Sequence, residues 1–191
     1  MNRLEDQRRP LIAVIGDASV PEDAPSGDLA FQLGRSLVDA GFRVLTGGLG
    51  GVMEAACLGA RNSDNYQNGD TVGVLPGFSA DNANRGVDIA IPTGLEFARN
   101  SVVALSKAVV AVGGGAGTLS EICHAWIHKR LIVTLGSEGW AGRLAGERLD
   151  RRVRYREIPD DRIYSASTAE EAVELLQNLL PLYNKRHRPK E

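Results

Sequence analysis

The sequence predicts an α/β fold in which a doubly wound, mostly parallel sheet carries helices on both faces, a Rossmann-like arrangement. Short apolar runs alternate with segments whose apolar residues recur at helical spacing. The run at 109–112 is apolar throughout, which is typical of a strand covered on both faces. Two of the runs end in glycine-rich turns that lead into helices, at 46–51 and 113–117. Such alternation favours parallel strands joined by helical crossovers.

Each expected strand is a short apolar run that a glycine, a proline or a polar turn ends. We expect strands at residues 11–15, 43–46, 71–75, 87–91, 109–112, 131–135 and 163–164. Each expected helix follows a turn and repeats its apolar residues three or four positions apart. We expect helices at residues 28–40, 51–62, 93–106, 118–130, 140–149 and 167–183. The longer polar stretches between them are expected loops, at 17–27, 62–70, 78–86 and 151–161.

Three of the helix starts carry the spacing of a capping box. In that motif a Ser or Thr and a Glu three residues later bond each other's backbone amides. The pairs are Thr93 with Glu96, Thr118 with Glu121, and Ser167 with Glu170.

Length and composition predict one domain over residues 1–184, followed by a mobile charged tail at 185–191. The net charge of −2 gives no reason to expect nucleic acid or a membrane as partner. No apolar run approaches the ~20 residues that cross a bilayer. The charged first ten residues do not resemble a signal peptide. We therefore expect a cytoplasmic protein whose two cysteines, Cys57 and Cys123, are reduced.

Both glycine-rich turns predict an anion site, most often one for phosphate, because glycines expose backbone amides and a helix start offers unpaired N–H groups. Parallel strands would bring the two turns to the same edge of the sheet. No lysine follows the glycines, which excludes the phosphate loop of nucleoside triphosphatases. The first strand lacks G-x-G-x-x-G after it, which argues against NAD or FAD. The candidate ligand contacts are Gly47, Gly48, Gly50, Gly51, Gly114, Gly115, Ala116, Gly117 and Thr118.

Charged residues near the two turns are candidates for binding or catalysis. Arg99 could pair with a phosphate, and the alternative is a surface pair with Glu96. Glu121 could stabilise an oxocarbenium-like centre or position a water molecule, and the alternative is the helix cap described above. Glu54 could contact the sugar or ring of a phosphorylated ligand, although acidic residues are also favoured in a first helical turn.

Further polar residues are weaker candidates. Asp17 and Ser19 follow the first strand and are candidate contacts for the ring of such a ligand. Glu121, His124 and His128 share a helix face, but the sequence lacks the H-E-x-x-H order of zinc enzymes. We therefore expect no metal site and interpret the histidines as solvated or interface residues.

Three stretches resemble the superfamily often misnamed lysine decarboxylase-like, whose characterised enzymes are phosphoribohydrolases of LOG type. They are T46-G-G-L-G-G-V-M-E-A, Arg99-Asn100 and G113-G-G-A-G-T-L-S-E121. The enzymes carry P-G-G-x-G-T-x-x-E, whereas Val112 and Gly113 stand here where a Pro-Gly pair would begin that motif. In this departure the chain is more similar to a second branch, the molybdenum cofactor carrier proteins.

The resemblance implies a phosphorylated heterocyclic ligand. The carrier branch implies a bound molybdenum cofactor, a phosphate-bearing pterin, with no settled reaction. The enzyme branch implies cleavage of a nucleoside 5′-monophosphate into a free base and ribose 5-phosphate, with Arg99 and Glu121 as catalytic residues, Asn100 as a ligand contact and no cofactor required. A nucleotide sensor without turnover is a third alternative. Both branches imply a homo-oligomer, a dimer or tetramer, and neither implies lysine decarboxylation.

Overall fold

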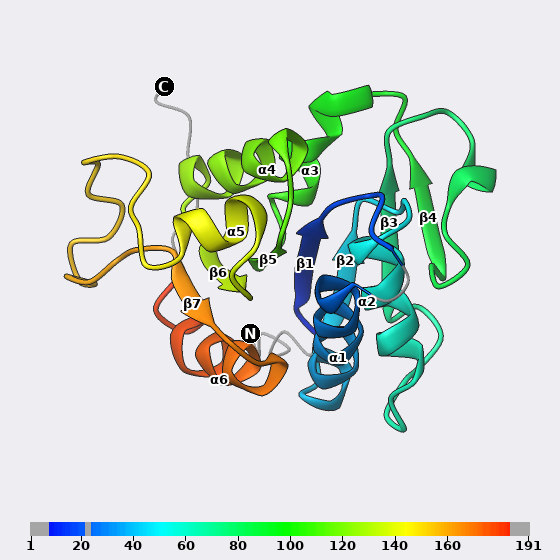
Figure 1. The fold of residues 1–191 in the computed structure, drawn as a ribbon, viewed down its shortest axis with the longest axis horizontal. Coiled ribbons are helices and arrows are strands. Elements are labelled where there is room, and N and C mark those ends of the chain that lie inside the picture. Colours follow the sequence, from blue (N-terminus) through cyan, green and yellow to red (C-terminus); the bar gives the residue numbers. More distant parts are fainter. Residues whose placement is uncertain (1–7, 22–23, 184–191) are drawn as a thin grey trace, which may run out of the picture.

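The computed structural model describes residues 8–21 and 24–183, so the expected tail at 185–191 lies outside the described residues. Its centre is a seven-stranded sheet in which every neighbouring pair is parallel (Figure 1). The strands are β1 Leu11–Gly16, β2 Arg43–Thr46, β3 Thr71–Leu75, β4 Ile89–Pro92, β5 Ala108–Val112, β6 Leu131–Leu135 and β7 Tyr164–Ala166. Their order across the sheet is β4-β3-β2-β1-β5-β6-β7. The predicted doubly wound α/β fold is confirmed.

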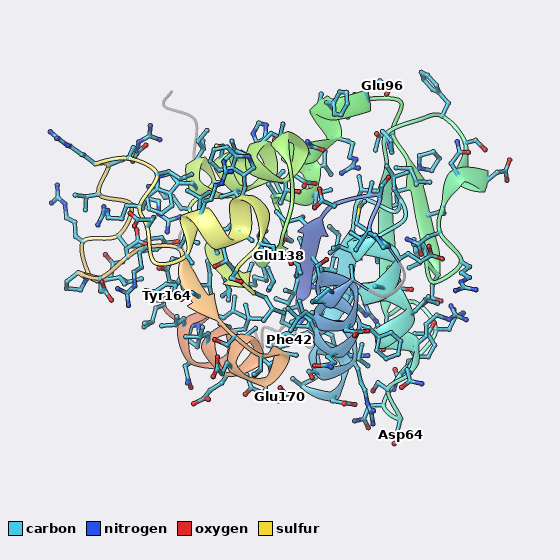
Figure 2. All side chains as sticks on the ribbon, in the orientation of Figure 1. Phe42, Asp64, Glu96, Glu138, Tyr164 and Glu170 are labelled. Carbon is cyan, nitrogen blue, oxygen red and sulfur yellow. The ribbon has the colours of Figure 1, made fainter. Side chains whose placement is uncertain are left out.

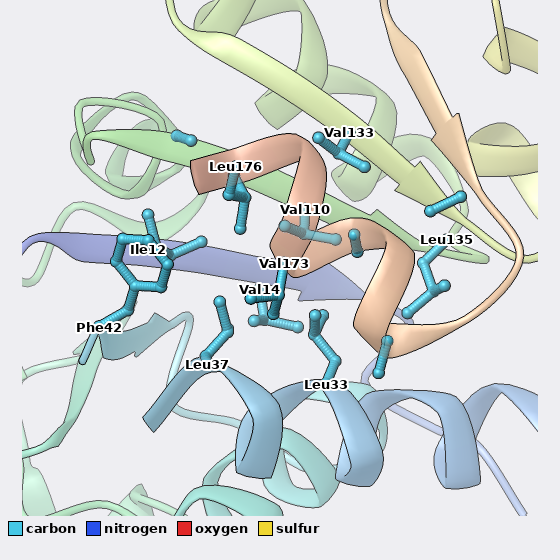
Figure 3. Packing of buried hydrophobic residues seen from close by; sticks show 14 of the residues in the cluster. Ile12, Val14, Leu33, Leu37, Phe42, Val110, Val133, Leu135, Val173 and Leu176 are labelled. Carbon is cyan, nitrogen blue, oxygen red and sulfur yellow. The ribbon is translucent and has the colours of Figure 1, made fainter. Parts of the chain in front are cut away.

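Helices cover both faces of this sheet. They are α1 Pro25–Asp39, α2 Val52–Arg61, α3 Asn100–Val103, α4 Ala116–Ile127, α5 Gly139–Leu144 and α6 Ala169–Leu179, with short 3₁₀ turns η1 Ala80–Asn82 and η2 Glu96–Arg99. One core lies between the sheet and α1, α2 and α6, where Leu33, Leu37 and Leu176 pack on Ile12 and Val110 (Figure 3). The other lies under α3, α4 and α5. Alternate residues of β1 and β5 serve the two cores, which explains their continuous apolar sequence.

The helix expected at 93–106 is the main error in the sequence prediction. The Thr93 hydroxyl donates to the Leu75 carbonyl and accepts from the Leu95 amide, so it does not cap a helix. Gly94 and Glu96 both have positive φ, at 64° and 48°, and this breaks any helical path. A 3₁₀ turn and the four-residue α3 replace the expected helix.

The other capping boxes are also displaced. Helix α4 begins two residues early, at Ala116, so Thr118 lies inside its first turn and Glu121 does not return to cap it. Thr168 rather than Ser167 caps α6, and Glu171 rather than Glu170 accepts from the Ser167 amide. Helix α1 starts at Pro25 instead of residue 28, because proline is well suited to a first helical position. The strands expected at 87–91 and 163–164 are shifted, to β4 and β7.

A buried polar cluster fixes the irregular chain between α5 and β7. The Arg154 guanidinium pairs with the Asp161 carboxylate, donates to the Arg130 carbonyl over 3.0 Å, and lies 3.6 Å from the centroid of the Trp126 ring. The Tyr183 hydroxyl donates to Asp161 as well, over 2.7 Å. These contacts tie the segment to β6, α4 and the end of the described chain. None of the described helices is long and apolar enough to cross a membrane.

Candidate functional site

The strand order changes direction between β1 and β5, and a cleft of about 320 Å³ lies there, beyond the carboxyl ends of the strands. This is the position at which doubly wound sheets bind ligands. Turns after β1, β2 and β5 line the cleft together with η2 and the starts of α2, α3 and α4. The lining residues are Gly16, Asp17, Ala18, Leu49, Met53, Phe97, Arg99, Asn100, Gly115, Ala116, Gly117, Thr118 and Glu121.

The turn after β5 presents the first amides of α4 to this cleft. The Leu119 amide donates to the Gly115 carbonyl, so the three helical residues before it have no partner of this kind within the helix. Gly117 has open space where a side chain would project. On the other side of the turn, the Trp140 and Ala141 amides donate to the carbonyls of Gly114 and Gly113, over 2.9 Å each. Helix α5 thereby holds these peptides in the orientation that aims the α4 start at the cleft.

Arg99 and Glu121 form a buried ion pair on the wall of the cleft. Nη1 of Arg99 donates to Oε1 of Glu121 over 3.1 Å, and the two residues are only 7% and 6% exposed. Burial raises the pKa of Glu121 to about 7, although the attraction of Arg99 opposes this rise. Burial also lowers the pKa of Arg99, against the pull of Glu121. The surface pair with Glu96 and the helix cap considered for Glu121 are therefore wrong.

Arg99 has one hydrogen-bond donor that is not used among the described residues. Its Nε is buried and has no hydrogen-bond partner among the described residues. The guanidinium lies against Gly47, since a Cβ built on that glycine would be 2.5 Å from Nη2. Gly47 of the first glycine-rich turn therefore leaves room for the guanidinium of Arg99. The same sequence stretch also contributes Leu49 and Met53 to the cleft wall.

The structure does not bring every candidate residue into the cleft. Glu54 forms an ion pair with Arg85 over 3.2 Å and lines a separate hollow of about 360 Å³ between α1 and α2, as does Gly51. Ser19 is exposed and lines neither hollow. The cleft lining also lacks Gly47, Gly48, Gly50 and Gly114.

Asn100 is in the cleft and also has a structural partner. Its amide donates to the Ser120 hydroxyl over 2.7 Å, and that hydroxyl donates to the Gly117 carbonyl. Asn100 thus links α3 to the first turn of α4. His124 stacks on His128 with ring centroids 6.2 Å apart, and His128 contacts the Ser101 hydroxyl. Among the described residues no group of three potential ligands could hold a metal ion.

Sequence reasoning missed the apolar part of the cleft. Leu49 and Met53 belong to the first glycine stretch, and Phe97 precedes Arg99 by two residues. Phe97 is 83% exposed, which is unusual for so large an apolar side chain. Its position two residues before Arg99 was the available signal, but Phe97 was not among the candidate ligand contacts.

Comparisons with known proteins identify the family of the chain. The model of the SLOG cluster4 family, LDcluster4, matches residues 9–173. The chain belongs to this family. SLOG cluster4 is a LOG-like family, so the resemblance to the LOG-type superfamily is confirmed. An uncharacterized protein of Archaeoglobus fulgidus is 36% identical over 125 residues, which cover 65% of this chain and 78% of that protein.

Solved structures place this SLOG cluster4 protein beside cofactor-binding proteins. The molybdenum cofactor binding protein of Rippkaea orientalis is 32% identical with a TM-score of 0.73, over 91% of this chain and 99% of the other. The molybdenum cofactor carrier protein of Chlamydomonas reinhardtii is 32% identical with a TM-score of 0.72, over the same shares. DNA processing protein A of Helicobacter pylori is 19% identical with a TM-score of 0.57, over 88% of this chain and 80% of the other, a likeness of fold alone.

Proposed function

We propose that the protein binds a phosphorylated heterocyclic ligand in the cleft between β1 and β5 and serves as a molybdenum cofactor carrier or binding protein. The observation that carries this proposal is the likeness to two such proteins, each 32% identical over 91% of the chain. The cleft supports it physically. The first turn of α4 offers amides to a phosphate, Arg99 offers a buried cation, and Leu49, Met53 and Phe97 offer apolar surface to a ring.

The direct test is the identity of the small molecule that copurifies with the protein. Wild-type protein and the Gly117→Val variant are purified in parallel from a host that makes the cofactor, then denatured, and the released molecules are analysed by mass spectrometry. We expect a phosphorylated pterin with the wild type and none with the variant, whose new side chain enters the open space at Gly117. A nucleotide in place of the pterin, or equal amounts with both proteins, contradicts the carrier function.

The second candidate is a nucleoside 5′-monophosphate phosphoribohydrolase, and the buried Arg99–Glu121 pair favours it. In that reaction AMP and water give adenine and ribose 5-phosphate. Arg99 would hold the phosphate, and the Glu121 carboxylate would act at the anomeric carbon. Chromatography for adenine separates the two functions. Release that disappears in Glu121→Gln, while phosphate affinity persists, establishes the enzyme, and no release above background supports the carrier.

We further propose that the protein acts in the cytoplasm as a homo-oligomer, a dimer or tetramer. Large apolar side chains are exposed on the layer formed by η2, α3 and the end of α4, including Phe97, Val102, Leu105 and Ile127. Ile89 and Ile91 of the edge strand β4 are exposed beside Val72 and Val74, on the same face of the sheet. A second copy could cover such a patch.

A further inference from the structure

Asp17 connects the two glycine-rich turns. Its backbone carbonyl accepts from the Val52 amide, at the start of α2, over 3.0 Å. Oδ2 of its side chain accepts from the Gly114 amide, also over 3.0 Å. One residue after β1 therefore ties the start of α2 to the turn before α4, and its carboxylate lines the cleft.

This carboxylate changes what the cleft can bind. The Gly114 amide, which the sequence suggested for phosphate, is already bonded to an anion that belongs to the protein. Oδ1 is also close to the turn, at 3.7 Å from an ideal Cβ on Gly115. The other charged groups lining the cleft are Arg99 and Glu121, which pair with each other. A bare anion that approaches the α4 start therefore meets the negative charge of Asp17, which repels it.

The same carboxylate can favour a ligand that brings a hydrogen-bond donor. A carboxylate has about four acceptor positions, and the Gly114 amide uses one of them. A hydroxyl or N–H group beside the phosphate of a ligand can take another, and bonds to a charged acceptor are among the stronger ones.

We propose that Asp17 is a specificity-determining residue that disfavours inorganic phosphate and favours phosphate esters with a neighbouring hydroxyl or N–H donor. This inference rests on the proposed function, because it concerns the same phosphate-binding cleft. The donor belongs either to a sugar or to a heterocycle, and these two sources differ in their response to the removal of the Asp17 charge.

The experiment is calorimetric titration of the wild type, Asp17→Asn and Asp17→Ala with inorganic phosphate, ribose 5-phosphate and AMP. Asn keeps an acceptor for the Gly114 amide and removes only the charge, whereas Ala also frees the amide. We expect phosphate to bind about tenfold tighter to Asp17→Asn, which corresponds to about 1.4 kcal/mol. Asp17→Ala should bind phosphate at least as tightly as Asp17→Asn does. The preference for AMP over phosphate should fall in both variants.

Asp64→Asn is the matched control, since it removes one exposed carboxylate from the loop after α2, far from the cleft (Figure 2). Its affinities should equal those of the wild type, and thermal melting should show all three variants folded. If the preferences for ribose 5-phosphate and for AMP over inorganic phosphate both fall in the Asp17 variants, the donor is a sugar hydroxyl. If only the preference for AMP over inorganic phosphate falls, the donor is on the heterocycle.

Two results have different consequences. Phosphate affinity that is unchanged in Asp17→Asn, with AMP binding intact, overturns the role of Asp17 and leaves the proposed function standing. If none of the three probes binds the wild type or either variant, the role of Asp17 in phosphate discrimination fails, whereas the proposed carrier function is decided separately by the molecule that copurifies with the protein.

Discussion

The side chains of Arg99 and Glu121 come from separate elements, 22 positions apart in sequence, and meet inside the cleft. Burial penalises both charges, and each partially relieves the penalty of the other. The carboxyl of Glu121 emerges with a pKa near neutrality, so its proton can be gained or lost under physiological conditions. Ionisable groups with strongly shifted pKa values are common in functional clefts, and at the residue scale this pair has that property.

The raised pKa of Glu121 predicts a pH-dependent stability. Its ordinary value is 4.5 and its folded value about 7, so between these values the folded protein retains a proton that the unfolded chain has released. The stability from this group is full below pH 4.5 and is lost as the pH rises through about 7. The slope contributed is at most about 1.4 kcal/mol per pH unit. Glu121→Gln should flatten the decline, as measured by urea unfolding from pH 5 to 8.

The control for this measurement is Glu170→Gln, which neutralises an exposed carboxylate on the first turn of α6. It should retain the pH dependence of the wild type. If Glu121→Gln follows the wild-type curve across this range, its carboxyl does not titrate as the structure indicates.

Gly117 predicts a variant that folds but does not bind. No atom lies within 4 Å of an ideal Cβ at this position, and the residue lines the cleft. Val should therefore be accommodated, with a change in melting temperature of about 2 °C or less, and should reduce affinity for AMP or a phosphorylated pterin at least about tenfold. Gly77→Val is the control, because Gly77 is equally unobstructed but lies outside the cleft. Equal affinity in both variants argues against a ligand at the α4 start.

At the scale of elements, short α5 supports the glycine-rich turn from behind. Its first amides bond the carbonyls of Gly113 and Gly114, and Gly139 allows the close approach. A Cβ on Gly139 would lie 2.6 Å from backbone atoms of those two residues. The shape of the turn before α4 therefore depends on a helix that does not line the cleft.

Gly139→Ala should be more damaging than Gly146→Ala. Both glycines have positive φ, at 57° and 80°, so both substitutions share a backbone cost of about 1–2 kcal/mol. Only Gly139 adds an overlap with backbone atoms, because Gly146 has nothing within 4 Å. We expect Gly139→Ala to melt about 5 °C lower than Gly146→Ala and to bind ligand more weakly. Similar melting temperatures for the two variants would falsify the supporting role of α5.

Elements that depend on local sequence patterns could be predicted from the sequence, whereas elements that depend on tertiary contacts could not. Strands β2, β3 and β6 are short segments rich in Val, Leu and Ile that turns bound on both sides, and their predicted bounds are correct. The expected helix at 93–106 fails because positive φ at Glu96 and the bond from Thr93 to Leu75 depend on tertiary contacts. The fold class and the approach of the β5 turn to Arg99 could be anticipated. The Arg99–Glu121 bond and the Asp17–Gly114 bond could not, since no local pattern encodes them.

At the scale of the whole molecule, the two faces of the sheet are covered unequally. Helices α1 and α2 follow β1 and β2 and cover one face of the sheet there (Figure 1). The connection from β3 to β4 contains only the short turn η1, so no long helix covers the sheet at this edge. The other face ends in exposed Ile89 and Ile91 on β4 and in exposed Val102 and Leu105. This asymmetry is the physical argument for self-association.

Light scattering at micromolar concentration should give at least twice the mass of one chain. Replacing Val102 and Leu105 together by Asp should reduce that mass to a monomer, because buried charges without partners are costly at an interface. The control is Val153→Asp, since Val153 is exposed at 65% on the irregular segment before β7. A wild-type monomer at every salt concentration contradicts the proposed oligomer.

The buried cluster around Arg154 has a consequence for mutational tolerance. Arginines occupy positions 151, 152, 154 and 156, which look interchangeable in the sequence, yet only Arg154 is buried. Its loss would leave Asp161 as a buried charge without its cation, with only the Tyr183 hydroxyl still donating to it, and would uncover the ring of Trp126. In a saturation-mutagenesis library selected for folded protein, the three exposed positions should accept most residues. Position 154 should accept almost none, not even lysine, whose point charge cannot reproduce the paired contacts of a guanidinium.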